Sequence, residues 1–480
     1  MRSLPGKLIG ALARGCQPGG GRPASWWFGG GLALFAFSWM YLGSVLIHET
    51  NLDRLSSDQQ YNIELAKDMR DDWFPHRSQG VVNPLWPWLA SKFGDPASDS
   101  ATYLRGRWFN LLLTLGFLLG LALLLRGRWG ELPALLCAAL GGFGALLGRA
   151  VYFQPEPLYY LLSFAAWALM LSTFWRNPWW RFAAIGMLCG LAYLAKSAIT
   201  PMLGGYLVFA LAVAAVALAF RRRPALAMPA GWSPARQLGG VALALLCFAA
   251  VVAPRAWYSQ QQFGSPFHSW PSYWMWQDDF GSESIPFMAA HPDAAALDAI
   301  PPDEVPSLGN YLASHSAAEV RERLLSGMAA RFHEFFFHEG DLRERADDKP
   351  WKAVLRYRGC YLAALGVLAL ALLVAAWRAR ALRGRWLPVA AGALFVLAIG
   401  CGYWLAFGWY YRIGRGPRFM LGLFLPLVYA LFAACVWLER RLDTAHPLRR
   451  LAILPGALGL LALSLAARLG ELLVNPHFVD

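Results

Sequence analysis

The sequence predicts an all-α polytopic membrane protein with about eleven transmembrane helices and two long outer loops that carry interfacial helices. Three observations support this fold class. Hydrophobic residues make up 57% of the 480 residues and charged residues only 15%, whereas soluble domains carry about 25% charged residues. Apolar runs of about 20 residues, long enough to cross a hydrocarbon core, recur along the whole chain. The basic residues are concentrated in alternate connecting segments.

The predicted spans follow one another from a basic N-terminal leader, residues 1–25. The first apolar run is too long for the core of a signal peptide and has no clear cleavage site, so we interpret it as a retained signal anchor. The spans are expected at residues 26–47, 107–125, 131–148, 157–175, 179–195, 200–220, 237–254, 358–377, 386–407, 418–438 and 451–468.

The charge distribution predicts the orientation of these spans. With the N-terminus in the cytoplasm, the inside segments hold 20 Lys and Arg residues against three acids, as the positive-inside rule requires. This pattern explains the net charge of +13 without a nucleic-acid partner. We therefore expect a transmembrane catalytic module at 26–254 that includes the first outer loop, 48–106. A second outer loop at 255–357 and C-terminal transmembrane helices at 358–480 follow.

Each outer loop is expected to carry an amphipathic helix. In the first loop, Ser57 and Gln60 have the spacing of a capping box, and an apolar stripe follows with a period of four: Tyr61, Leu65, Met69 and Trp73. In the second loop, Ser316 and Glu319 have the same spacing ahead of a second stripe: Val320, Leu324, Met328 and Phe332.

Within the apolar runs, the small residues of GGFGALLG (141–148) are expected to allow close helix packing. The seven cysteines lie mostly inside apolar runs and form no CxxC pair. A disulfide framework or a zinc site is therefore not expected.

The alternation of spans brings two acids and several bases to the outer membrane face. Asp58 follows the first span, and Glu156 stands at the outer start of the fourth span in QPEP. The bases at this face are Lys196, Arg255, Arg412, Arg415 and Arg418. Because ionisable groups are costly in a bilayer, we expect these side chains to pair or to line a polar cavity.

This set of residues suits sugar transfer from a lipid carrier. A carboxylate takes the proton of an attacking hydroxyl or amine, which assigns Asp58 as the base. The leaving lipid phosphate needs cations, and the candidates are Lys196, Arg255, Arg412, Arg415 and Arg418. Glu156 is expected to orient the acceptor or to hold a metal ion.

The order of the motifs resembles the GT-C superfamily of polyprenyl-phosphate-sugar-dependent glycosyltransferases, which includes protein O-mannosyltransferases and the lipid A aminoarabinose transferase. The matching stretches span about 400 residues: SDQQYNIELAKDM, NPLWPWLAS, RGRWFNLLL, QPEPLYYLL, GLAYLAKSAITP, PRAWYSQQQFGSPF and RGPRFMLGLFLPL. The resemblance implies Asp58 as the base, a functional role for Glu156, and donor-phosphate binding by Lys196 and Arg418.

The resemblance leaves the metal requirement open, because Gln59 stands where many relatives have Glu. If a divalent cation such as Mg²⁺ or Mn²⁺ binds, Asp58 and Glu156 are its expected ligands. The implied partners are a polyprenyl-phosphate-linked sugar, a lipid, glycan or protein acceptor, and the bilayer of a bacterial inner membrane, with the active site outside.

Other interpretations of these residues stay open at this point. Asp58 could be a helix first-turn acid, Lys196 a residue that snorkels to the interface, and the Arg412–Arg418 cluster a lipid head-group site. His48 and His268 are further site candidates that could equally be structural. Two alternative functions also stay open. The first is a transporter or flippase of a lipid-linked sugar, and the second is an oligosaccharide polymerase or ligase.

Overall fold

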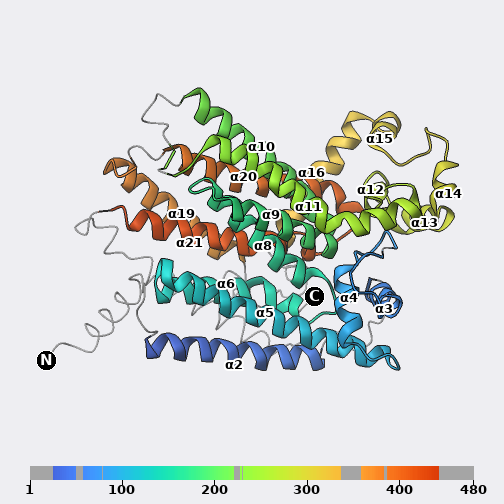
Figure 1. Cartoon of the computed structure of the whole chain (residues 1–480), viewed down its shortest axis with the longest axis horizontal. Coiled ribbons are helices and arrows are strands. Elements are labelled where there is room, and N and C mark those ends of the chain that lie inside the picture. The colour runs from blue at the N-terminus through green and yellow to red at the C-terminus, as the bar shows by residue number, and fades with distance from the viewer. Residues whose placement is uncertain are drawn as a thin grey trace, which may run out of the picture.

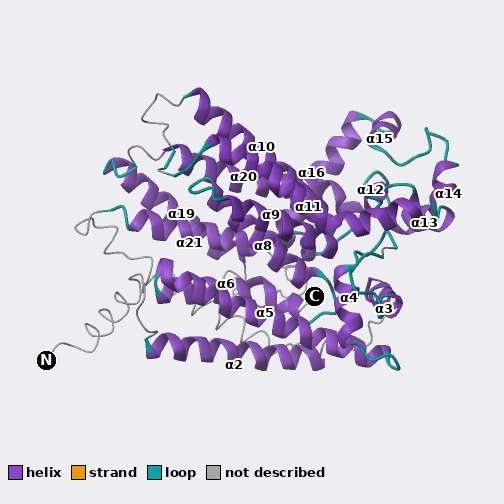
Figure 2. Cartoon of the chain, in the orientation of Figure 1, coloured by secondary structure: helices purple, strands orange, loops and turns teal. Residues whose placement is uncertain are grey.

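The computed structural model describes residues 25–49, 58–77, 79–220, 228–229, 231–336, 358–382 and 386–442. These residues form helices and loops (Figure 2). The long helices of the bundle are α2 (Trp26–Glu49), α5 (Asp99–Trp129), α6 (Glu131–Gly141), α8 (Glu156–Thr173), α9 (Trp179–Ala195), α10 (Thr200–Ala219), α11 (Pro234–Phe263), α19 (Arg358–Arg378), α20 (Trp386–Trp409) and α21 (Phe424–Glu439). The π-helix η1 (Gly142–Leu146) joins α6 to the short helix α7 (Leu147–Ala150).

The bundle confirms an all-α polytopic membrane protein. In the described part of the chain, eight helices are long and apolar enough to cross a membrane. Each of the first ten predicted spans overlaps one of the long helices. The eleventh predicted span, 451–468, and the leader before Ser25 lie outside the described residues.

Two helices extend well beyond the apolar runs that predicted them. Helix α5 begins at Asp99, where the Ser98 hydroxyl accepts a hydrogen bond from the Ala101 amide at 3.2 Å. Helix α11 ends at Phe263, and its C-cap residue Gly264 has a left-handed φ of +69°. Hydropathy marks the part of a helix that crosses the apolar layer, whereas capping residues decide where the helix ends.

The elements of the two outer loops gather at one end of the bundle (Figure 1). The first loop supplies α3 (Asp58–Asp68) and α4 (Leu85–Phe93). The second supplies α12 (Trp270–Trp274), η4 (Phe280–Ser284), α13 (Ile285–Ala290), α14 (Ala294–Asp298), α15 (Leu308–Ser314) and α16 (Ala317–Phe336). The 3-10 turns η5 (Tyr410–Arg412) and η6 (Pro417–Phe419) connect α20 toward α21 at the same end.

Helix α3 forms where the first loop predicts a helix, but its buried face is different. Leu65 and Met69 of the predicted stripe are buried, whereas Trp73 lies beyond the helix and is 84% exposed. Gln59 and Asn62 are buried instead. The single apolar stripe is therefore wrong, because α3 turns amide side chains toward a polar cavity. Ser57 of the expected capping box lies outside the described residues.

Helix α16 has the predicted capping box but an unexpected buried face. The Glu319 carboxylate accepts from the Ser316 amide at 2.8 Å, and the Ser316 hydroxyl accepts from the Glu319 amide at 3.3 Å. The face packed against α20 carries Arg323, Gly327 and Arg331, all buried, while Phe332 of the predicted stripe is 49% exposed.

Glycines allow the closest helix approaches in the bundle. A Cβ atom at Gly144 would lie 2.8 Å from the Phe424 ring of α21, which confirms close packing at GGFGALLG. On α16, a Cβ atom at Gly327 would overlap the carbonyl oxygen of Gly408 in α20. Since that neighbour is backbone, it cannot move aside as a flexible side chain would.

We predict that Gly327→Ala destabilises the fold by about 1–3 kcal/mol, the usual cost of overpacking. Gly402→Ala in α20 is the matched control, because a Cβ atom there has no neighbour within 4 Å. Thermal unfolding in detergent should show a lower melting temperature for Gly327→Ala alone. Equal melting temperatures for the two variants would contradict the close contact.

Candidate active site

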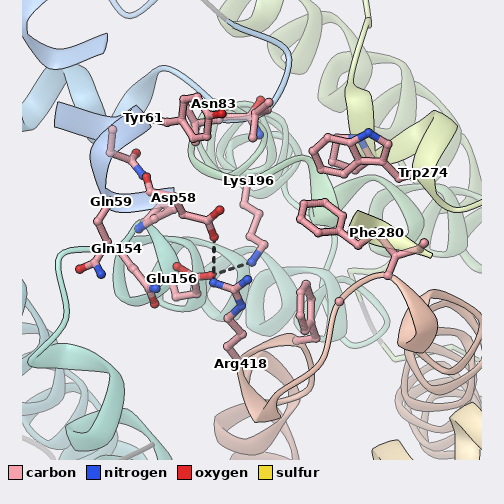
Figure 3. Close-up of a pocket in the computed structure, with 18 of the residues that line it drawn as sticks. Asp58, Gln59, Tyr61, Asn83, Gln154, Glu156, Lys196, Trp274, Phe280 and Arg418 are labelled. Atoms are coloured by element: carbon pink, nitrogen blue, oxygen red, sulfur yellow. Dashed lines mark hydrogen bonds and ion pairs between the residues drawn. The ribbon is translucent and has the colours of Figure 1, made fainter. Parts of the chain in front are cut away.

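A cavity of about 680 Å³ lies at the end of the bundle that carries α3 and α12, where six segments of the chain meet. One wall consists of side chains whose oxygen atoms can accept hydrogen bonds, and we call it the acceptor wall. These side chains come from α3 and from the entry to α8: Asp58, Gln59, Asn62, Gln154 and Glu156. Its cationic wall is formed by Lys196, Arg415 and Arg418. Its outer wall is apolar and comes from the second outer loop: Pro271, Trp274, Phe280, Ile285 and Met288. Figure 3 shows members of all three walls facing one space.

The first ion pair of the cavity joins Asp58 and Arg418. An Nη atom of Arg418 lies 2.9 Å from the Asp58 carboxylate (Figure 3). The Asp58 side chain is 45% exposed and that of Arg418 28% exposed. Asp58 is the first residue of α3, and its carbonyl oxygen accepts from the Asn62 amide side chain at 2.5 Å. One carboxylate is thus both oriented and open to the cavity.

The second ion pair joins Glu156 and Lys196 and is more deeply buried. Lys196 Nζ lies 2.8 Å from Glu156 Oε1, and the Glu156 side chain is only 4% exposed. Helix α9 ends at Ala195, and the extended backbone of its C-cap residue Lys196 directs the ammonium group toward the start of α8. Lys196 and Arg418 both lie 5.1 Å from the Phe419 ring, so the two cations flank one aromatic side chain.

A buried polar network holds the segment that leads into Glu156. The Asn110 amide side chain donates to the carbonyl oxygens of Tyr152 and Gln154 at 2.8 and 2.9 Å. The Arg107 guanidinium donates to the carbonyl oxygens of Val151 and Leu46. Neither residue was predicted to have a role, although an Arg and an Asn at the entry to an apolar run are a signal that could have found them.

Side chains of α16 bind the backbone of residues 409–418, which we call the arginine segment. Arg331 donates to the carbonyl oxygens of Phe407, Gly414 and Gly416. Glu334 accepts from the Gly416 amide at 2.8 Å and also pairs with Arg331. Because these side chains are buried, the arginine segment carries Arg415 and Arg418 on a fixed support. Sequence patterns missed this role because α16 was expected to bury its apolar stripe.

Four of the predicted site residues lie outside the cavity lining. Arg255 is buried and donates to the Tyr193 hydroxyl and to the carbonyl oxygens of Pro266 and His268. His268 is itself buried, with its ring 4.1 Å from that of Phe263. Arg412 pairs with Asp278 at 2.8 Å, and the exposed His48 lies beside Trp108. Asp58, Gln59, Glu156, Lys196, Arg415 and Arg418 line the cavity.

The acceptor wall has oxygen atoms that lack a hydrogen-bond donor. Within the described residues, Gln59 Oε1, Asn62 Oδ1, Gln154 Oε1 and Glu156 Oε2 are buried with no partner. Buried acceptors of this kind are costly unless a ligand donates to them. A ligand rich in hydroxyl groups, such as a sugar, would satisfy them.

The same wall is a poor fit for a divalent cation. Among the described residues, no group of three His, Cys, Asp or Glu side chains is arranged to hold a metal ion. Both cavity carboxylates are already neutralised by Arg418 and Lys196. A Mg²⁺ or Mn²⁺ ion, which the sequence left open, would therefore meet no excess of negative charge at this wall.

Comparisons with known proteins give one likeness. No family model matches the chain, and no curated protein matches it. Among solved structures, the fold is similar to the archaeal oligosaccharyltransferase AglB from Archaeoglobus fulgidus, solved with an inhibitory peptide and a dolichol-phosphate. The two share 17% identity with a TM-score of 0.39, over 93% of this chain and 56% of AglB.

We predict that Lys196→Met lowers the free energy of unfolding by about 3 kcal/mol, because it leaves the Glu156 carboxylate buried without its partner. The double variant Glu156→Gln with Lys196→Met should regain more than half of the loss. Lys67→Met is the control, since its pair with Asp99 is about half exposed on both sides and contributes about 0–1 kcal/mol. Denaturation in detergent measures all three, and equal losses for Lys196→Met and Lys67→Met would contradict a buried pair.

Proposed function

We propose that this chain is an inverting glycosyltransferase that moves a sugar from a polyprenyl-phosphate carrier to an acceptor hydroxyl or amine at the outer face of the membrane. The observation that carries the proposal is the composition of the cavity. One space joins an accessible carboxylate, a cationic wall, a wall of unpartnered acceptor oxygens and an apolar wall. A phosphorylated lipid that carries a sugar has the matching parts.

The donor would bind with each of its parts against one wall. Its phosphate would lie against Lys196, Arg415 and Arg418, which supply charge-assisted hydrogen bonds. Its sugar hydroxyls would donate to the acceptor wall. The first isoprene units of the lipid would lie on the outer wall and on Val81 and Val82, which also line the cavity.

The transfer step would need one base and no covalent enzyme intermediate. The acceptor oxygen or nitrogen attacks the anomeric carbon of the sugar, and its proton passes to Asp58. The bond between that carbon and the phosphate oxygen breaks, and its electron pair stays on the phosphate, where Lys196 and Arg418 stabilise the added charge. The products are the glycosylated acceptor and the polyprenyl phosphate, with inversion at the anomeric carbon.

Asp58 suits the role of base better than Glu156 because of its access. The Asp58 side chain is 45% exposed, whereas that of Glu156 is 4% exposed and fixed to Lys196. A base must reach the proton that it removes. Glu156 would instead keep Lys196 in place and orient the acceptor or sugar.

The positions of the charges favour surface chemistry over transport. The cavity residues belong to the outer end of the bundle, where both outer loops meet (Figure 1), whereas transporters bind their substrates near the bilayer midplane. With the N-terminus in the cytoplasm, the cavity would face the periplasm of a bacterial inner membrane. The positive-inside distribution of Lys and Arg supports this orientation.

We predict that Asp58→Asn lowers sugar transfer by about 10²–10⁴-fold, the usual contribution of a general base. The assay offers purified protein a panel of polyprenyl-phosphate sugars with lipid, glycan and peptide acceptors. Asp68→Asn, an exposed acid at the other end of α3, is the control and should keep full transfer.

The variant should remain folded, since the pair of Asp58 with Arg418 is part exposed and such pairs contribute about 0–1 kcal/mol. Full transfer by folded Asp58→Asn would remove Asp58 from its role. Movement of labelled lipid across liposomes with no new glycosidic product would favour a flippase instead.

A further inference from the structure

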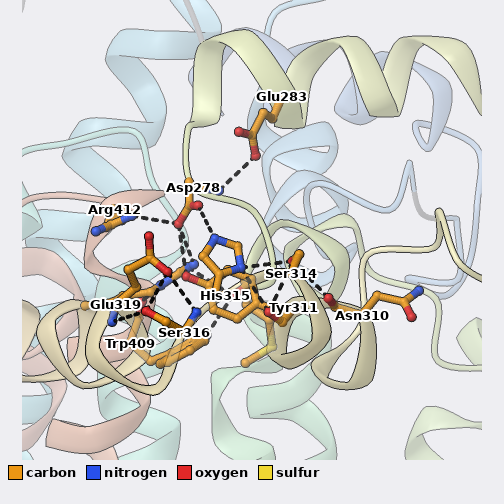
Figure 4. Close-up of polar contacts among 12 residues, drawn as sticks. Asp278, Glu283, Asn310, Tyr311, Ser314, His315, Ser316, Glu319, Trp409 and Arg412 are labelled. Atoms are coloured by element: carbon orange, nitrogen blue, oxygen red, sulfur yellow. Dashed lines mark hydrogen bonds and ion pairs between the residues drawn. The ribbon is translucent and has the colours of Figure 1, made fainter.

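The carboxylate of Asp278, outside the cavity, receives donors from three separate elements (Figure 4). His315 Nε2 lies 2.8 Å from Oδ2. The other oxygen, Oδ1, accepts from Arg412 at 2.8 Å and from Arg323 and the Tyr311 hydroxyl at 3.1 Å each. These donors come from α15 or its C-cap, from α16 and from η5. The part-exposed Asp278 carboxylate thus links α15, α16 and η5 to its own segment of the chain.

The chain around Asp278 forms the outer wall of the cavity. Trp274 and Phe280 lie on either side of Asp278 in the chain, and both line the cavity. On the opposite side of the contact, Arg412 directly precedes Ile413 and Gly414, which also line it. Asp278 therefore joins the outer wall to the arginine segment.

The two sides of this contact are held by different groups. The arginine segment is bound to α16 through the buried Arg331 and Glu334. The outer wall reaches the same support through Asp278 and through the Met275 carbonyl, which accepts from Arg323 at 3.1 Å and from Trp409 Nε1 at 2.7 Å. Loss of Asp278 would therefore loosen the outer wall and leave the arginine segment in place.

His315 is placed to donate from both ring nitrogens when it is protonated. Its Nε2 faces the Asp278 carboxylate, and its Nδ1 lies 2.9 Å from the Tyr311 carbonyl oxygen. Only the imidazolium form donates from both nitrogens. Partial burial works to lower the pKa of His315, but the hydrogen bonds to Asp278 and to the Tyr311 carbonyl outweigh it and leave the pKa raised.

The charge on His315 makes the contact dependent on pH. A raised histidine pKa stabilises the folded contact below about pH 6.5, and that stabilisation is lost as the pH rises through the raised value. Burial works to raise the pKa of Asp278, but its hydrogen bonds to His315 and Tyr311 outweigh it, so the pKa is lowered and the carboxylate stays ionised. The groups that act on this pair from the packed elements are Tyr311, Ser314, Glu319, Arg323 and Arg412.

We propose that Asp278 is a positioning residue that holds the outer wall over the cavity, and that His315 makes this hold tighter when it is protonated. The effect on the lipid phosphate rests on the proposed function, whereas the effect on the outer wall does not. The chemical consequence would be an affinity for a phosphorylated isoprenoid that falls as the pH rises.

The first test compares Asp278→Asn with Asp293→Asn in the full chain. Asp293 belongs to the same outer loop but caps α14 and does not line the cavity. In Asp278→Asn, hydrogen–deuterium exchange should become faster over residues 275–290 and stay unchanged over α16. The dissociation constant for farnesyl phosphate should rise about tenfold, as expected when a charge-assisted contact is lost. Unchanged exchange over 275–290, or the same change in Asp293→Asn, would overturn the proposal.

The second test uses His315→Gln, which keeps a donor toward Asp278 but does not titrate. Between pH 6 and pH 9 the dissociation constant for farnesyl phosphate should rise more for the wild type than for His315→Gln. Parallel pH profiles would overturn the role of His315. Arg412→Gln, which removes a part-exposed arm of the contact, replaces Asp278→Asn if that variant does not fold.

The two hypotheses fail in different ways. If the wild type neither binds farnesyl phosphate nor transfers sugar, the proposed function is wrong and the exchange of residues 275–290 alone decides the role of Asp278. If the wild type binds and transfers while Asp278→Asn behaves like the wild type in exchange and affinity, only the positioning role is wrong.

Discussion

The cavity depends on the neutralisation of each of its acids by a base from a distant part of the chain. Asp58 and Arg418 are 360 positions apart in the sequence, and Glu156 and Lys196 are 40 apart. A broken Glu156–Lys196 pair would leave a costly buried charge, and together the two pairs join α3, α8, α9 and the arginine segment. The paired side chains line the cavity, so they remain available to interact with a ligand.

A second layer of polar side chains keeps this arrangement rigid. Asn110 and Arg107 bind the backbone ahead of Glu156, and Arg331 and Glu334 bind the backbone around Arg418. In both cases a buried side chain donates to or accepts from main-chain groups that have no helical partner. Buried hydrogen bonds of this kind favour one conformation of the backbone that they hold. The outer wall is joined to the same support through Asp278 and the Met275 carbonyl oxygen, both of which accept from Arg323.

Much of the fold was predictable from the sequence, because apolar length and the distribution of Lys and Arg report directly on membrane crossing. The meeting of Asp58, Glu156, Lys196 and Arg418 followed from simple alternation of the spans. The positions of Arg255 and His268 were harder to predict. Their place in the sequence does not indicate that the Arg255 guanidinium binds the His268 carbonyl oxygen and not a ligand. The buried face of α16 was missed because its arginines bind backbone carbonyls, a pattern that hydrophobic periodicity does not register.

The dependence of α16 on a later part of the chain has a consequence for biosynthesis. Arg323 and Arg331 are synthesised 76 to 86 residues earlier than the residues whose carbonyl oxygens they bind. Those residues are Phe407, Trp409, Gly414 and Gly416. At about 5–20 residues per second, these guanidinium groups wait several seconds in a hydrated state. Dehydration of α16 against α20 is therefore among the last steps of assembly, and a nascent chain that stalls before residue 407 would expose a basic, unfinished surface to quality-control proteases.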